Sequence, residues 1–117
     1  MFTLTNLERT KLEISFDFPE ETLKVYLEEN GLDPEVEYSP QSNYNKKAIY
    51  SVVLQVLENV SQDINLMKNY KADEMSVTDF HENLLNKIQV MERKIRMMSA
   101  NDDTTNGNSS VFILFNS

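Results

Sequence analysis

The stretch "SVTDFHENLLNKIQVMERKIRMM" (residues 76–98) has the clearest structural pattern in this chain of 117 residues. Ser76 and Asp79 have the spacing of a helix-capping box, with Asp where Glu is more usual. Beyond them, apolar residues recur at intervals of three or four, which puts them on one face of a helix. The pattern therefore predicts a long helix with one continuous apolar seam, made of Phe80, Leu84, Ile88, Met91, Ile95 and Met98.

A second apolar stripe, within residues 39–60, provides a partner for this seam. Ser39 and Pro40 are predicted as the N-cap and the first residue of its helix. The stripe is too wide to be buried from one side, so we expect a central helix that is covered on both sides. Its apolar residues are Tyr44, Ala48, Ile49, Val52, Val53, Val56, Leu57 and Val60. We expect the 76–98 seam to pack against Ile49, Val52, Val56 and Val60, because each stripe needs a partner.

Two shorter helices are predicted before the central one. Residues 5–14 carry a loose apolar edge that includes Leu7 and Leu12. Pro19 opens the second helix, and Gly31 ends it in the left-handed conformation. Residues 64–75 have no sustained period and are predicted to form a loop. These elements predict an all-α fold, a small bundle of about four helices in residues 1–98.

The stretch "NDDTTNGNSSVFILFNS" (residues 101–117) differs from the rest of the chain, because polar residues lead into an apolar pentapeptide. We interpret residues 99–117 as a polar linker and an extended docking arm that ends in a short strand. A strand of this sequence has two apolar faces and needs burial on both. We expect it to bind a sheet edge of another subunit or of a partner protein, although it could instead fold back into a groove of its own domain. The predicted partner-binding residues of the arm are Val111, Phe112, Ile113, Leu114 and Phe115.

The net charge of −8 is unevenly distributed, since residues 1–45 contain ten acidic and three basic residues. An acidic surface argues against a general nucleic-acid-binding protein, which needs cations to bind phosphates. Three further predicted partner-binding residues, Arg93, Lys94 and Arg96, form a basic cluster near the end of the 76–98 helix. We expect this cluster to meet the acidic N-terminal region of a neighbouring subunit, because opposite charges on one domain suit head-to-tail contacts.

The sequence contains no recognisable catalytic, cofactor or metal motif. His81 is the single histidine, and its helical neighbours offer no second ligand or acid, so a structural role is expected. The chain has no cysteine for a disulfide or a thiolate zinc site. It also has no secretory signal and no run of ~20 apolar residues that would cross a membrane. We therefore expect a protein without enzymatic activity, cofactor or membrane segment.

The order of the parts resembles the small head-to-tail adaptor proteins of tailed bacteriophages over residues 7–98. The resemblance rests on "YLEENGLDPEVEYSP", "AIYSVVLQVLENV", a loop, the 76–98 helix and an extended tail. It implies an α-helical virion protein, assembled in the host cytoplasm, that forms a homo-oligomeric ring, commonly of twelve copies. Such a ring connects the portal protein to the tail or to further ring proteins. DNA passes through its lumen without specific binding, and it carries no catalytic residues.

Two other functions remain open from the sequence. An acidic regulatory or inhibitory protein of the DNA-mimic type would act by protein–protein binding. It would have acids dispersed along one face of a monomer or dimer, whereas here the acids gather in the N-terminal third. An enzyme is the weaker alternative, because no pattern pairs a nucleophile with a base.

Overall fold

The computed structural model describes residues 3–106, with side chains as far as Met98. This part of the chain forms five helices: α1 (Asn6–Glu13), α2 (Glu20–Glu29), α3 (Asn43–Ser61), α4 (Ile64–Tyr70) and α5 (Val77–Asn106). The described residues contain no β-strand, only an isolated bridge between Thr5 and Glu37. The predicted all-α class is confirmed, whereas the expected count of about four helices misses one. The predicted strand at 111–115 lies outside the described residues.

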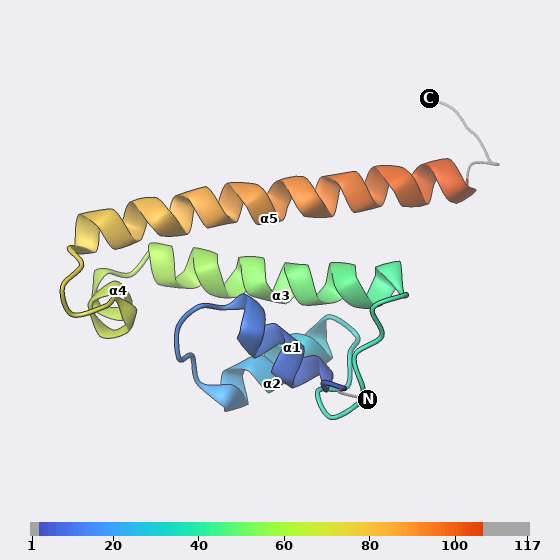
Figure 1. The fold of residues 1–117 in the computed structure, drawn as a ribbon, viewed down its shortest axis with the longest axis horizontal. Helices are drawn as coiled ribbons and strands as arrows, with labels where there is room; N and C mark the ends of the chain where they lie inside the picture. Colours follow the sequence, from blue (N-terminus) through green and yellow to red (C-terminus); the bar gives the residue numbers. More distant parts are fainter. Residues whose placement is uncertain (1–2, 107–117) are drawn as a thin grey trace.

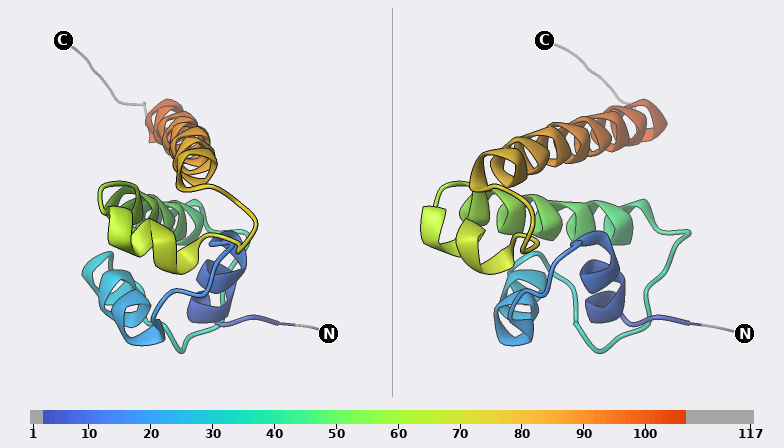
Figure 2. Two further views of the ribbon diagram at one scale, coloured as in Figure 1. Left: turned by 90° about the vertical axis from the view of Figure 1, so that its left-hand side faces the viewer. Right: turned by 60° about the vertical axis from the view of Figure 1, so that its left-hand side comes forward.

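The helices form three layers (Figures 1 and 2). Helix α5 is one outer layer and runs antiparallel to α3, α3 lies in the middle, and α1 and α2 form the other outer layer. Helix α4 lies beside the end of α3 and leads into α5. Helix α3 is therefore covered on two sides, as its wide apolar stripe predicted.

The α3–α5 interface is the most extensive helix contact, and it confirms the predicted seam. Ile49, Val52, Val56 and Val60 of α3 are buried. So are Phe80, Leu84, Ile88 and Met91 of α5, whereas Ile95 and Met98 are half-buried. Burial therefore decreases along the seam toward the C-terminal end of α5.

Helix α5 is longer than its partner. Its 30 residues span about 45 Å and the 19 residues of α3 about 28 Å, at ~1.5 Å per residue. Because α5 starts beside the end of α3, its far end extends past the start of α3 (Figure 1). We predicted a helix that ends near residue 98, whereas the backbone stays helical to Asn106. We call residues 99–106 the overhang; they were expected to begin the linker.

Two other predictions about helix boundaries were wrong. Residues 64–70 form α4 instead of a loop, since the Asp63 carboxylate accepts hydrogen bonds from the backbone N–H groups of Asn65 and Leu66 at 2.9 and 3.3 Å. Helix α3 begins at Asn43 instead of Pro40, because Ser42 is the N-cap and its hydroxyl accepts the Asn45 N–H at 3.1 Å.

The N-terminal helices match their predicted positions. Thr5 and Glu8 form a reciprocal capping box at the start of α1, and Gly31 follows α2 with φ of 83°. The exception is Leu12, which we placed on the apolar edge. It is 69% exposed, because α1 turns Leu7 and Thr10 inward instead.

A buried amide pair attaches α1 to α3. The Asn45 amide donates to the Asn6 side-chain oxygen at 3.0 Å, and its own oxygen accepts the Ser39 N–H at 2.7 Å. The Asn6 amide donates to the Asp33 carbonyl at 2.9 Å. This network fixes the acidic outer layer against the central helix, since buried polar groups keep their hydrogen-bond partners.

Candidate functional site

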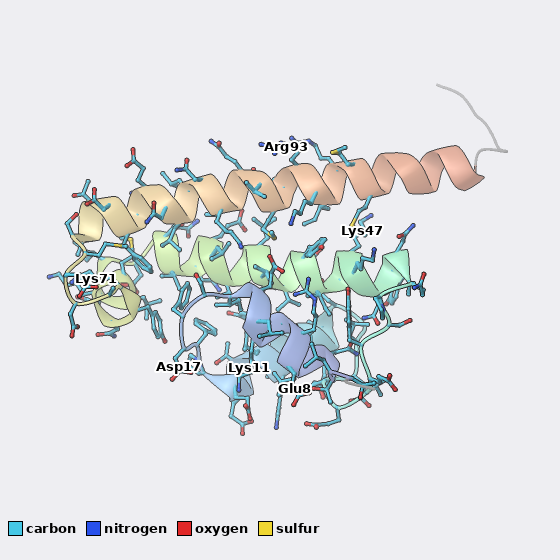
Figure 3. All side chains as sticks on the ribbon, in the orientation of Figure 1. Glu8, Lys11, Asp17, Lys47, Lys71 and Arg93 are labelled. Carbon is cyan, nitrogen blue, oxygen red and sulfur yellow. The ribbon has the colours of Figure 1, made fainter. Side chains whose placement is uncertain are left out.

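The predicted cationic residues lie on the exposed side of α5. Arg93, Lys94 and Arg96 are all exposed, and none of the four ion pairs among the described residues involves them. Arg93 points away from α3 (Figure 3). Lys94 instead reaches toward α3, where its ammonium lies 5.3 Å from the centre of the Tyr50 ring. These charges are therefore available to an external partner.

A cavity of about 370 Å³ adjoins this basic surface. The adjoining cavity lies between the first turns of α3 and the C-terminal half of α5, and Lys46, Lys94 and Met97 line it. Met97 is 61% exposed. We call Arg93, Lys94 and Arg96 the basic end of the molecule.

The opposite outer layer is acidic. All three cations of residues 1–45 pair with acids of the same region: Arg9 with Glu13 at 2.9 Å, Lys11 with Glu20 at 2.8 Å, and Lys24 with Glu35 at 3.7 Å. Most of the acids are exposed, and we call the exposed set the acidic layer: Glu8, Asp17, Glu20, Glu21, Glu28, Glu29, Asp33, Glu35 and Glu37. Glu8 and Asp17 lie on the side of the molecule opposite Arg93 (Figure 3).

The basic end and the acidic layer are thus separated by the central helix within one subunit. Our expectation that they meet across a subunit boundary stays a prediction. The structure adds that Arg93 faces away from the acidic layer of its own subunit, so this layer does not supply its partner within one subunit.

Glu13 is a charged residue whose role the sequence did not indicate. Its carboxylate accepts hydrogen bonds from Arg9 at 2.9 Å and from Lys87 of α5 at 3.3 Å, and its side chain is only 16% exposed. Partial burial raises the pKa of Glu13, but the bonds and charges of Arg9 and Lys87 outweigh it and leave the pKa below its ordinary value. Arg9 also lies over the Tyr38 ring, 5.4 Å from its centre. This chain of contacts connects α5, α1 and the connector before α3, which fits a structural role.

A cavity of about 440 Å³ with a mainly aromatic and aliphatic lining lies at the start of α5, far from the overhang. The Phe16 and Tyr70 rings stack with centres 5.2 Å apart, and Phe16 meets Phe80 edge-on at 5.9 Å. We call this cavity the aromatic groove; its lining includes Phe16, Tyr70, Ala72, Met75, Phe80, Leu84 and Lys87. The sequence did not reveal it, because Phe16 and Met75 come from connectors and Tyr70 from the unpredicted α4.

The described residues contain no group of three or more histidine, cysteine or acidic residues arranged to hold a metal ion. His81 is half-buried in the first turns of α5, as expected from its position in the sequence. Within the described range, no helix has the length and apolar character needed to cross a membrane.

Comparisons with protein-family models, with curated proteins and with solved structures find no significant match to this chain. The apolar arm residues Val111, Phe112, Ile113, Leu114 and Phe115 lie outside the described residues, so their docking role stays a prediction.

Proposed function

We propose that this chain is a structural assembly protein, specifically a head-to-tail adaptor of a tailed-phage virion. In this role, copies form a ring below the portal protein and join it to the tail or to further ring proteins. The specific assignment derives from the resemblance described above. The general class, an assembly protein, is supported by the arrangement of charge on the molecule.

The observation that carries the proposal is the separation of the basic end from the acidic layer. The cations within the acidic region are already paired with acids of the same subunit, so that layer keeps a net negative charge. The basic end lies on the other side of the central helix, with Arg93 directed outward (Figure 3). Two different, complementary surfaces on one subunit favour heterologous contacts, which form closed rings when the rotation between copies permits.

The overhang and the residues that follow it supply a second connection. Helix α5 carries the chain beyond the start of α3 (Figure 1). The apolar residues 111–115 therefore follow from the far end of the molecule instead of its core. A contiguous apolar segment of this kind gains stability when it is buried against a partner, and in water it is an aggregation hazard.

Deletion of residues 111–117 tests the arm. Because the core of the bundle lies within residues 7–91, we expect the shortened chain to remain a folded, helical monomer that no longer attaches to its ring or portal partner. Circular dichroism measures the fold, and native mass spectrometry with the portal protein of the same genome measures attachment. Normal attachment, or loss of the monomer fold, would contradict the docking-arm role.

A second candidate is a regulatory protein that mimics DNA. The clustering of acids in the N-terminal third counts against it, but nine of these acids are exposed, as such a protein requires. Such a protein would be a monomer or dimer that competes with DNA for a DNA-binding partner. A stable monomer that displaces DNA from such a partner, without binding a portal protein, would favour this candidate over the adaptor.

A further inference from the structure

We propose that the aromatic groove of one copy receives the apolar residues 111–115 of a second copy of the same chain. This inference rests on the proposed assembly function and adds to it the surface on which the arm docks. It replaces the sheet edge expected from the sequence with a groove that buries side chains.

The aromatic groove has the size and the chemistry of a binding site. Its volume of about 440 Å³ lies in the range of ~300–1,000 Å³ typical of ligand pockets. Phe80 and Leu84 are buried beneath it, whereas Phe16, Tyr70 and Met75 are only half-buried. Partly exposed apolar side chains of this kind gain stability when a partner removes them from water.

Residues 111–115 match this groove in chemistry. They are five consecutive apolar residues without charge, and two of them are Phe. The described residues contain no β-strand, so another copy presents no regular sheet edge in this part of the chain. The aromatic groove instead offers Phe16, Tyr70 and Phe80 for contacts with apolar and aromatic side chains.

The length of the chain indicates that the groove belongs to another copy. Phe80, the aromatic groove residue of α5, lies about 39 Å along the axis from Asn106, at ~1.5 Å per residue. From Asn106, the nine residues to Phe115 reach at most about 32 Å when fully extended, at ~3.6 Å each. The backbone of the last apolar residue of the arm therefore falls short of Phe80 in its own subunit.

The arm continues from one end of the molecule, and the aromatic groove lies at the other end. In the sequence, the arm follows Asn106 at the far end of α5 (Figure 1), whereas the groove is lined by residues from the start of that helix. Each copy can thus give its arm to one neighbour and receive an arm from another. This is the heterologous, head-to-tail arrangement from which rings are built.

Complementation between two variants tests the inference. The arm variant carries Phe112→Ser, Ile113→Ser and Leu114→Ser and keeps the groove. The groove variant carries Ala72→Trp, in which an exposed residue of the lining becomes large enough to fill the groove. Val25→Trp, on an exposed site of α2 outside the groove, is the matched control. Native mass spectrometry measures the species present, and circular dichroism checks that each variant is folded.

We expect the unaltered chain and Val25→Trp to form oligomers, and the arm and groove variants to be monomers when each is alone. Their equimolar mixture should form a one-to-one dimer and nothing larger, because only one functional arm and one functional groove remain in each pair. Oligomers of the groove variant equal to those of the unaltered chain would overturn the inference. So would a mixture that stays monomeric while the unaltered chain assembles.

A cross-link provides a second measurement that does not depend on filling the groove. The chain contains no cysteine, so Ala72→Cys and Ile113→Cys can be placed on separate copies and oxidised together. We expect a disulfide-linked heterodimer from this pair and far less from Val25→Cys with Ile113→Cys. Equal yields from the two pairs would contradict docking in the groove. If the chain attached to a portal protein without this cross-link, the groove inference would fail and the adaptor function would stand.

Discussion

Helices α3 and α5 are the two longest helices of the molecule, yet they are covered to different extents. Helix α3 lies between two layers, and its apolar stripe is buried from Ala48 to Val60. Helix α5 is buried only along one seam, from Phe80 to Met91, and presents Arg93 and Arg96 to solvent. Helix α3 therefore serves mainly the fold, whereas α5 contributes one face to the fold and leaves Arg93 and Arg96 exposed for partners.

The largest loss of stability should come from truncating a buried side chain in the α3–α5 interface. Val56→Ala in α3 or Ile88→Ala in α5 should lower the free energy of unfolding by about 2–4 kcal/mol, because each leaves a cavity in the core. Urea denaturation measures the change. The control is Leu85→Ala, since Leu85 is 42% exposed on the same helix, and it should stay within about 0.5 kcal/mol. A loss below about 0.5 kcal/mol at Val56 would mean that the seam does not carry the fold.

The second-largest loss of stability should come from breaking the buried amide pair of Asn6 and Asn45. Asn45→Ala leaves the Ser39 N–H and the Asn6 side-chain oxygen without the partner that they have here. We expect a loss of about 1–3 kcal/mol, as is typical of buried groups that lose their hydrogen bonds. Asn59→Ala is the matched control, because the exposed Asn59 amide bonds only at the surface, to the Tyr26 hydroxyl. Equal losses of stability in Asn45→Ala and Asn59→Ala would show that burial of the amide pair contributes nothing to stability.

Glu13→Gln should have a smaller effect that depends on pH. Because the pKa of Glu13 is lowered in the folded chain, ionised Glu13 stabilises the fold above the ordinary carboxyl value of 4.5. That contribution is lost as the pH falls through the lowered pKa. We expect a difference from the unaltered chain of about 1 kcal/mol near neutral pH, reduced by solvent at the exposed Lys87, and little difference in acid. Denaturation series at several pH values measure it; a difference that is constant with pH would contradict the assignment.

The smallest effect on stability should come from the outer face of α5. Reversal of charge at Arg93, Lys94 and Arg96 to Glu should cost about 0.5 kcal/mol, chiefly from the lost contact between Lys94 and Tyr50. Assembly should weaken nevertheless, most at low salt, where screening is least. Sedimentation velocity at two salt concentrations measures this. An oligomer distribution that does not change would argue against the basic end as an assembly surface.

The sequence predicted the features that depend on long, regular apolar spacing. The seam from Phe80 to Met91 and the stripe of α3 repeat over several turns, so their faces and their pairing could be inferred. Gly31 was also predictable, because few other residues adopt a φ of 83° after a helix. These signals are local or periodic, and they need no knowledge of the tertiary structure.

The missed features depend on contacts between distant segments or on very short elements. Helix α4 has seven residues and a single buried one, Met67, which is too little to set a period. Ser42 is the N-cap, since its hydroxyl accepts the Asn45 N–H, whereas the Ser39 N–H donates to the Asn45 side chain, which also bonds across to Asn6. Glu13 and Lys87 are 74 residues apart in the chain, and the aromatic groove likewise combines separate connectors. The function has no comparable periodic signal, so it remains a proposal drawn from surfaces.

Helix α5 packs closely against α3 along only part of its length, so a tilt about the packed part displaces its far end. Its first half is held against α3 by the seam from Phe80 to Met91, and the overhang continues past the start of that helix (Figure 1). A small tilt at the seam moves the end of the helix farther than it moves the seam, in proportion to the distance from the pivot. The direction in which the chain leaves at Asn106 therefore responds strongly to small changes in the packing of the seam. Neighbouring copies attached through this end could vary their relative angle while each keeps the same bundle.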